Sequence, residues 1–272
     1  MSNSEIRSRA WQIYKGNLIL LIGATFIITL LNVGGDRLNN SALSLIMAVI
    51  TTVLQVGIYY INFRAWVDGS AKWNQLNIPL TQPAYRKRLL PVLLVQNSVI
   101  LLSAVPLLRF ILLNMDDPFF FMMNGVMILL LFLLIIVAAV AVGRMWYIYI
   151  VKPELKTGEI LKKSAVYMSR HWGEELWFSI TITFIPAIIT AIMIDIIDPS
   201  VLSLLLVPVQ AYISLAITGF VYERIILVEQ ARENLAEMLT ESAIKTTEET
   251  TSETLPPETL PVEHPEKAET DN

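Results

Sequence analysis

The stretch HWGEELW, residues 171–177, contains residue types that commonly carry out chemistry in proteins. His171 stands three residues before Glu174, and Glu175 follows directly. A zinc peptidase of the His-Glu-x-x-His type needs two imidazoles on one helix, so that both face the metal ion. The only other histidine, His264, lies near the end of the chain. The sequence therefore predicts no metal site and no catalytic site in this stretch.

Other common catalytic patterns are also missing. The sequence contains no Gly-x-Ser-Gly motif, no phosphate-binding loop and no Gly-x-Gly-x-x-Gly motif. It has no cysteine, which excludes disulfides, thiolate nucleophiles and cysteine-ligated metals. We expect a protein that is not an enzyme, needs no cofactor and binds no nucleic acid. A membrane hydrolase is the third alternative, and it would require Glu174 or Glu175 to face a cavity beside a second catalytic group.

The composition is typical of a membrane protein. Of the 272 residues, 54% are hydrophobic and 16% are charged, whereas an ordinary soluble domain has roughly 25% charged residues. About 20 apolar residues in a helix cross a hydrocarbon core of about 30 Å. The sequence predicts an all-α fold with six transmembrane helices in a membrane domain over residues 18–223. Their approximate ranges are 18–33, 41–63, 89–108, 119–142, 176–197 and 201–221.

The distribution of basic residues predicts the orientation of these spans. An even number of spans places both termini on one side, and cytoplasmic loops carry an excess of Lys and Arg. Lys and Arg number 3 before the first span, 5 between the second and third, 6 between the fourth and fifth, and 4 after the sixth. The opposite side holds only Arg37 and Arg109. We expect a multi-pass protein of the cytoplasmic membrane with both termini in the cytoplasm.

Within this topology, the stretch HWGEELW has a structural interpretation. An interfacial amphipathic helix over about residues 156–172 would turn into the bilayer at Gly173, because glycine tolerates a break in helical geometry. Glu174 and Glu175 would then begin the fifth span, where the helix dipole favours acidic residues. Gly16 holds the corresponding position after an N-terminal cytoplasmic amphipathic helix over residues 1–17. We expect hinges at Gly16 and Gly173, and a solvated His171.

The sequence also contains two similar segments, which suggest an internal repeat. SEIRSRAWQIYKGNLILLIGATFI, from Ser4, aligns with GEILKKSAVYMSRHWGEELWFSITITFI, from Gly158. Each copy predicts an amphipathic helix that leads into two spans from the same side, so the repeat would be parallel. The apolar stripe consists of Ile6, Ala10, Ile13 and Tyr14 in the first copy, and of Ile160, Leu161, Ser164, Tyr167 and Met168 in the second.

These segments, together with VPVQAYISLAITGFVYERI at the end of the sixth span, resemble a bacterial multi-pass membrane family catalogued as domain of unknown function nine-seven-five. The resemblance covers most of residues 4–224. It implies a multi-pass helical topology, and the family has no established activity to transfer. The positions that match the family pattern are Ser164, Met168, Gly173, Phe178, Pro208, Tyr212, Phe220 and Tyr222.

The end of the chain differs in character from the membrane domain. The sequence ILVEQARENLAEMLTESAIK predicts a cytoplasmic helical extension over residues 224–244. Residues 245–272 are rich in Glu, Thr and Pro and lack the apolar content of a core. Residues 241–272 contain 9 acids and 2 bases. We expect a disordered acidic tail over residues 245–272 that is available to a protein partner.

Two sets of polar residues are candidates for binding. Arg86, Lys87 and Arg88 precede the third span, where they would anchor the topology or bind the anionic headgroups of the cytoplasmic face of the lipid bilayer. No predicted span contains an ionisable residue near its centre, which argues against a proton relay. Uncharged polar residues remain in the spans. Gln96, Asn97 and Gln210 would either form hydrogen bonds between helices or line a cavity.

The sequence therefore favours a non-catalytic integral membrane protein that acts as a scaffold, a regulator or a component of the response to envelope stress. The alternative is a transporter of a small solute or a lipid, with a polar cavity between the third, fifth and sixth spans. A dry, closely packed bundle in that region would argue against the transporter.

Overall fold

The computed structural model describes residues 1–37, 41–114, 124–194, 196–236 and 238. Residues 1–229 form one compact unit, and residues 230–272 belong to a second. Nearly all the described residues are helical and none of them lies in a strand, which confirms the all-α fold class. The elements are α1 (Asn3–Gly16), α2 (Leu18–Asp36), α3 (Ser41–Asp68), η1 (Trp73–Asn77), α4 (Ile78–Thr81), α5 (Pro83–Asn114), α7 (Gly125–Val142), α8 (Met145–Val151), α9 (Thr157–Met193), α10 (Pro199–Leu205), α11 (Val207–Phe220) and η2 (Val221–Ile226).

Five helices of the described residues are long and apolar enough to cross a membrane. The apolar run of α7 is shorter, at Gly125–Ile135. The predicted fourth span, 119–142, begins outside the described residues and coincides with α7 from Gly125 onward. The five long apolar ranges are Leu18–Gly35, Ala42–Asp68, Pro83–Leu112, Thr157–Met193 and Val207–Ala236.

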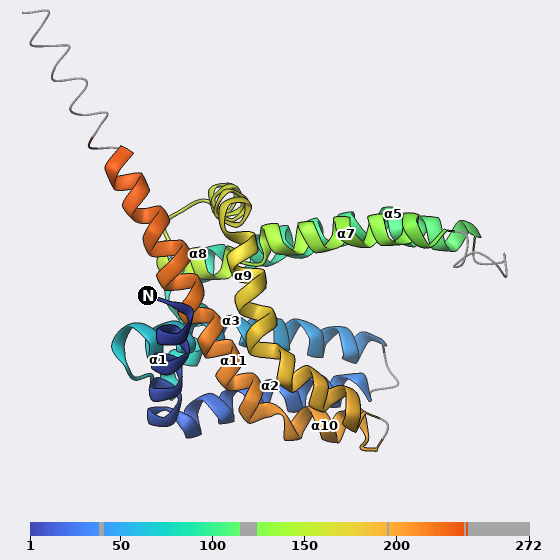
Figure 1. Cartoon of the computed structure of the whole chain (residues 1–272), viewed down its shortest axis with the longest axis horizontal. Coiled ribbons are helices and arrows are strands. Elements are labelled where there is room, and N and C mark those ends of the chain that lie inside the picture. The colour runs from blue at the N-terminus through green and yellow to red at the C-terminus, as the bar shows by residue number, and fades with distance from the viewer. Residues whose placement is uncertain (38–40, 115–123, 195, 237, 239–272) are drawn as a thin grey trace, which may run out of the picture. The chain divides into compact units, whose positions relative to one another are not determined.

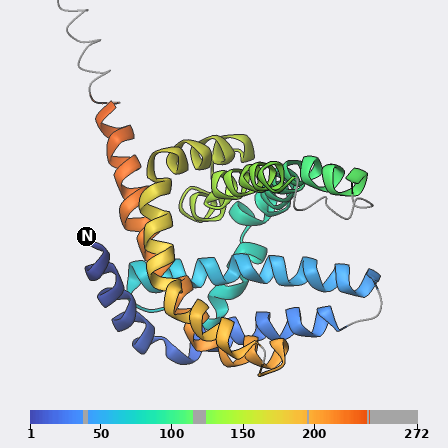
Figure 2. The ribbon, with the colours of Figure 1, turned by 45° about the vertical axis from the view of Figure 1, so that its right-hand side comes forward.

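Two pairs of helices pack side by side in the first unit. The helix α2 lies along α3, and α5 lies along α7 (Figures 1 and 2). The central helix α11 contacts α1, α2, α3 and α9. Between α7 and α9, the short helix α8 is almost wholly buried, with the six residues from Met145 to Ile150 all in the core. This buried, aromatic-rich helix was not predicted as a separate element.

The N-terminal helix α1 begins at a capping box formed by Ser2 and Glu5. Ser2 accepts a hydrogen bond from the backbone N–H of Glu5, and the Glu5 carboxylate accepts one from the backbone N–H of Ser2. This reciprocal capping box satisfies two backbone donors that the first helical turn leaves free. The predicted apolar stripe of α1 is confirmed, because its four members are the buried residues of this helix. The stripe packs α1 against α11 and the main hydrophobic core.

The interfacial helix and the fifth span, predicted as separate elements, form one continuous helix of 37 residues, α9. The expected break at Gly173 is therefore wrong. A glycine inside a helix costs only about 1 kcal/mol relative to alanine, which the packing of α9 against α7, α8 and α11 outweighs. Figures 1 and 2 show that α9 changes direction along its length without an interruption.

A segment that sequence reasoning missed folds back along α2 and α3 after α3 ends at Asp68. We call residues 69–82 the folded-back segment. Gly69 has φ of 76°, a left-handed conformation that glycine adopts without strain. The Trp73 ring then lies against Gly23 of α2, and the Leu76 carbonyl lies against Gly57 of α3. Because a helix rises about 1.5 Å per residue, Gly57 lies roughly 16 Å before the end of α3.

The last part of the first unit differs from the single predicted span over 201–221. Asp198 caps α10 by accepting a hydrogen bond from the backbone N–H of Ser200 at 2.9 Å, which holds the pKa of Asp198 below its usual value. Pro208 lies in the first turn of α11, where its missing N–H leaves no intrahelical hydrogen bond unmade. The π-helical turn η2 follows α11 directly, and the chain continues as α-helix over 227–236.

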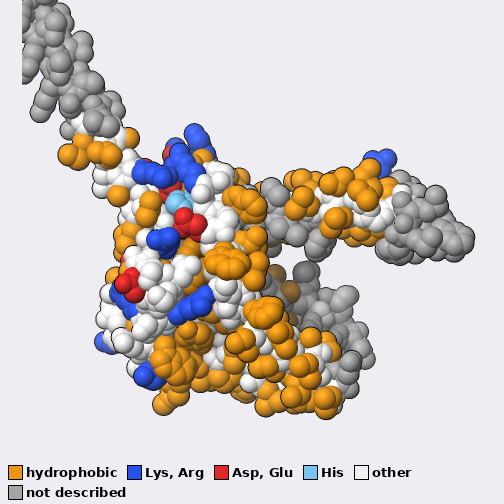
Figure 3. Space-filling view, in the orientation of Figure 1, with side chains coloured by type: hydrophobic (Ala, Val, Ile, Leu, Met, Phe, Trp, Pro, Cys, Tyr) orange, Lys and Arg blue, Asp and Glu red, His pale blue; other side chains and the backbone are white. Residues whose placement is uncertain are grey.

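Charged and apolar side chains separate along the first unit. On the face shown in Figure 3, charged side chains gather near α1 and the first part of α9, and hydrophobic side chains cover α2 and α10. An exposed ion pair between Arg37 and Asp198, at 3.4 Å, joins the C-terminal end of α2 to the N-terminal end of α10. Many large apolar side chains point outward, and Ile19 is 81% exposed. Such a surface is typical of helices that face lipid.

Candidate functional site

The stretch that opened the sequence analysis lies where α9 passes the end of α11. Because the α-helix has about 3.6 residues per turn, His171, Glu175 and Phe178 share one face of α9, and all three are buried. Glu174 lies about 60° around the helix from His171 and is exposed, with its side chain 54% accessible. The expectation of a solvated His171 is wrong, since its side chain is only 9% exposed. We call the charged residues gathered here the ion-pair cluster. Its members are Arg9, Arg144, Arg170, His171, Glu174, Glu175, Glu223, Arg224 and Glu229.

Glu229 is the most deeply buried acid of this cluster, with its side chain 1% exposed. His171 Nε2 lies 2.9 Å from one carboxylate oxygen of Glu229, and Arg170 donates to the other at 2.6 Å. An ionised carboxylate only accepts hydrogen bonds, so Nε2 of His171 carries the proton in this arrangement. The histidine therefore connects α9 to the helix that follows η2.

Glu175 forms a second buried ion pair, with Arg144 at the start of α8. Both side chains are largely buried, at 7% and 20% exposure. Burial lowers the pKa of Arg144, with Tyr147 opposing this effect, but a guanidinium stays protonated in proteins. The guanidinium also lies over the Tyr147 ring, 5.6 Å from its centroid. Breaking one side of such a buried pair is strongly destabilising, because it leaves the other charge unpaired.

A third contact connects α1 and α3 to η2. Arg9 donates to Glu223 at 2.9 Å and to the Trp66 carbonyl at 3.0 Å, and the Trp66 indole N–H donates to the same Glu223 oxygen at 3.0 Å. The guanidinium of Arg9 lies 4.7 Å from the centroid of the Trp66 ring, a cation–π distance. The ring is fully buried against Gly219 of α11, where no side chain larger than hydrogen fits.

The fourth pair lies at the surface. Arg224 donates to Glu174 at 3.2 Å, with the side chains 38% and 54% exposed, and it also donates to the Met1 carbonyl. An exposed pair of this kind contributes about 0–1 kcal/mol. The adjacent acids Glu174 and Glu175 therefore differ in burial, in partner and in their contribution to the stability of the fold.

In this arrangement, ion pairs neutralise the buried charges and hold the helices together. Each of the four acids pairs with an arginine on a different element, so their charges join α1, α8, α9 and η2. Within the part of the chain that the structure describes, no group of three or more His, Cys, Asp or Glu side chains is placed to hold a metal ion. His264 lies outside the described residues.

The basic residues predicted to contact lipid headgroups differ in their surroundings. Arg86 and Lys87 are exposed, whereas Arg88 donates to the carbonyls of Pro153 and Leu155 and so connects α5 to the loop before α9. A groove of about 280 Å³ is lined by Lys87 and Arg88 among others, and Glu154 places a negative charge in the same lining.

The residues predicted to line a polar cavity do not form one site. Gln210 is exposed on α11, and Asn97 is exposed on α5, where it donates to the Leu93 carbonyl of its own helix at 2.9 Å. Asn97 lines a groove of about 400 Å³ formed by α5 residues, which does not include Gln96 or Gln210. Among the described residues, no hydrogen bond joins Gln210 to either of the other two amides.

The two predicted hinge glycines lie at different positions within their helices. Gly16 is the last residue of α1, and Asn17 then separates α1 from α2. Gly173 lies inside α9. Neither glycine has a neighbouring atom where a β-carbon would be placed, so neither is required by close packing.

Sequence reasoning missed most partners in the ion-pair cluster. In the sequence, Arg144 and Glu223 closely follow predicted spans, and Glu229 lies within the predicted helical extension. The available signal was spacing, since Glu229 follows Ile225 by four residues and Ile226 by three, which are the spacings of one helical face. Spacing alone does not identify the helix that a charged face contacts.

Comparisons of the sequence with protein-family models, curated proteins and solved structures find no match. The functional argument therefore depends on the chain itself.

Proposed function

We propose that this chain is a non-catalytic integral membrane protein that acts as a scaffold or regulator, with its C-terminal extension and acidic tail presenting the binding surface for a protein partner. The observation that supports this proposal is the ion-pair cluster. The acids that would be catalytic candidates pair with arginines and hold elements together. A general acid or base would instead need access to a substrate.

The proposed topology has six spans, with α7 and the residues before it as the fourth and both termini in the cytoplasm. Five long apolar helices and the 18-to-2 division of basic residues support it. Membership of the bacterial family that the sequence resembles, and a role in the envelope, belong to the same proposal.

The test compares the full chain with a chain that ends after Lys245. Both are purified in native lipid particles, and all proteins, lipids and metabolites that co-purify are identified by mass spectrometry. A third variant keeps the tail length but replaces Glu248, Glu249, Glu253 and Glu258 with glutamine. We expect a stoichiometric protein partner with the full chain, and its loss from both variants while each stays in the membrane fraction. An identical set of partners for all three chains would contradict the proposal.

The alternative is a transporter of a small solute or lipid. The groove of about 400 Å³ beside Asn97 on α5 is the observation that favours it. In the same experiment, a stoichiometric solute that disappears on Asn97→Ala with Ser98→Ala, which change the polar lining of this groove, would support transport. A recurrent protein partner without a small ligand would favour the scaffold.

A further inference from the structure

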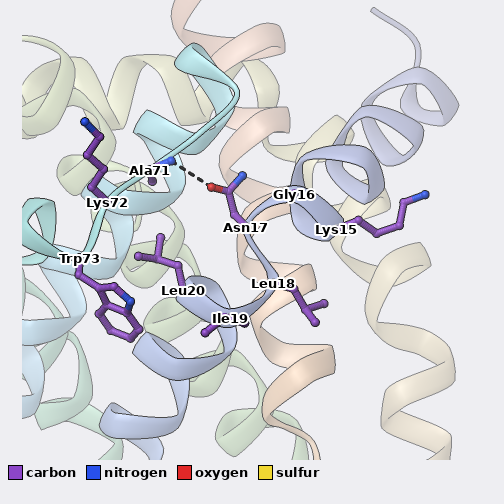
Figure 4. A pocket seen from close by; sticks show the side chains of 9 residues that line it. All are labelled: Lys15, Gly16, Asn17, Leu18, Ile19, Leu20, Ala71, Lys72 and Trp73. Atoms are coloured by element: carbon purple, nitrogen blue, oxygen red, sulfur yellow. Dashed lines mark hydrogen bonds between the residues drawn. The ribbon is translucent and has the colours of Figure 1, made fainter.

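A further cavity lies away from the ion-pair cluster, between the α1–α2 junction and the folded-back segment. Its volume is about 620 Å³, within the range of about 300–1,000 Å³ that is typical of pockets for small ligands. We call it the junction pocket. Figure 4 shows its lining, which comes from residues 15–20 and 71–73.

The walls of the junction pocket are held in place by Asn17. Its side chain is buried and donates to the Ile13 carbonyl at 2.9 Å and to the Gly69 carbonyl at 3.1 Å. Its side-chain oxygen accepts a hydrogen bond from the backbone N–H of Ala71 at 3.0 Å, drawn in Figure 4. One buried amide therefore fixes the distance between the two walls. Trp73 completes the pocket, since its ring lies against α2 in the space left by Gly23.

The charge of the junction pocket is entirely positive. Its titratable lining residues are Lys15 and Lys72, and no acidic residue lines it. Both lysines are exposed, and neither forms an ion pair within the described residues. Lys15 has only a long cation–π contact with Trp11, at 5.9 Å. Figure 4 shows the two side chains on opposite walls of the pocket, each extending away from the other. A lysine ammonium on its flexible stem binds phosphate as a point charge.

The rim of the junction pocket is apolar on the side where α2 begins. Leu18 is 42% exposed, Ile19 is 81% exposed and Trp73 is 46% exposed. Leu18 is also the first residue of the first candidate membrane span. Tryptophan favours the boundary between headgroups and acyl chains, because its ring is apolar and its N–H is polar. Positive charge therefore meets lipid-facing surface at this pocket.

We propose that the junction pocket binds the headgroup of an anionic phospholipid, with the flexible side chains of Lys15 and Lys72 turning toward the phosphate from the two walls and the acyl chains lying against Leu18 and Ile19. This inference depends on the proposed membrane location. The complementarity between two unpaired cations and an apolar rim selects a phospholipid over a soluble anion, which would gain nothing from the exposed leucine and isoleucine. The groove at Lys87 and Arg88 is a weaker candidate, because it contains Glu154 and Arg88 already binds backbone carbonyls.

The test measures lipid retention. The full chain is placed in bilayer nanodiscs of phosphatidylcholine with a minority of phosphatidylglycerol, and the lipids that stay bound after transfer to detergent are counted by native mass spectrometry. Lys15→Gln with Lys72→Gln removes both charges of the junction pocket. Arg86→Gln with Lys87→Gln is the matched control, since it removes two exposed charges on the same expected membrane face. Lys15→Arg with Lys72→Arg keeps both charges.

We expect the junction-pocket glutamine variant to lose its preference for phosphatidylglycerol by roughly 30-fold, while the control and the arginine variant keep it. An equal loss in the control would overturn the proposal, because binding would then come from general surface charge. Unchanged retention in the junction-pocket variant would overturn it too, as would inorganic phosphate that stays bound to the chain as well as the lipid does. Resistance to alkaline extraction from membranes is measured for every variant, so a chain that is not integrated refutes the membrane location itself.

Discussion

At the scale of the residue, neighbours in sequence occupy contrasting environments. Glu174 and Glu175 differ by about 100° around α9, which places one at the surface and the other in a buried pair with Arg144. The sequence placed two acids beside a histidine, residue types that can carry out chemistry, but it predicted no catalytic site there. The structure gives each of the three residues a different partner.

This contrast predicts unequal effects of the same substitution. Glu175→Gln should destabilise the fold by about 3–5 kcal/mol, because it leaves Arg144 buried without a counter-charge. Glu174→Gln should cost no more than about 1 kcal/mol, because its pair is exposed. The measurement is the midpoint of thermal unfolding in detergent for both variants. Equal shifts would contradict the assignment of the buried pair.

The glycines predict a second contrast. Gly219→Ala would place a methyl group at less than van der Waals distance from the carbons of the buried Trp66 ring. This overpacking should cost about 1–3 kcal/mol. Gly173→Ala meets no neighbouring atom and lies within α9, so it should stabilise the chain by up to about 1 kcal/mol. Thermal unfolding of the two alanine variants tests both signs. A destabilised Gly173→Ala chain would indicate that this position needs glycine's backbone freedom after all.

At the scale of the element, hydrophobic periodicity predicted the helices better than their ends. The stripe of Ile6, Ala10, Ile13 and Tyr14 could be identified because burial repeats every helical turn. The continuity of α9 could not be predicted, because local glycine preference and tertiary packing oppose each other at Gly173. The folded-back segment was also not predictable, because its contacts with Gly23 and Gly57 join residues far apart in sequence.

The attachment of the folded-back segment depends on one side chain. Asn17→Ala removes three hydrogen bonds, two of which hold Gly69 and Ala71 of the folded-back segment, at a cost of about 0.5–1.5 kcal/mol each. We expect faster amide hydrogen exchange over residues 69–77. Asn97→Ala serves as the control, because that exposed amide bonds only to its own helix. Exchange in 69–77 that rises equally in both variants would refute the anchoring role of Asn17.

At the scale of the whole molecule, the lack of cysteine allows a direct test of topology. Arg37→Cys places a thiol at the end of α2 that pairs with α10, and Lys162→Cys places one on the exposed first part of α9. We expect a membrane-impermeant maleimide to label the first variant in intact cells and the second only after permeabilisation. Labelling of both thiols from one side would contradict the proposed orientation.

The π-helical turn at Val221–Ile226 has a consequence for how this chain tolerates change in length. A π turn contains one residue more than an α turn, so it is equivalent to a single inserted residue. Deleting that residue would rotate Glu229 by about 100° around the helix axis, away from His171 and Arg170. The apolar composition of the span would be unchanged. Insertions and deletions of one residue between Gly219 and Glu229 should therefore be selected against far more strongly than substitutions that preserve apolar character there.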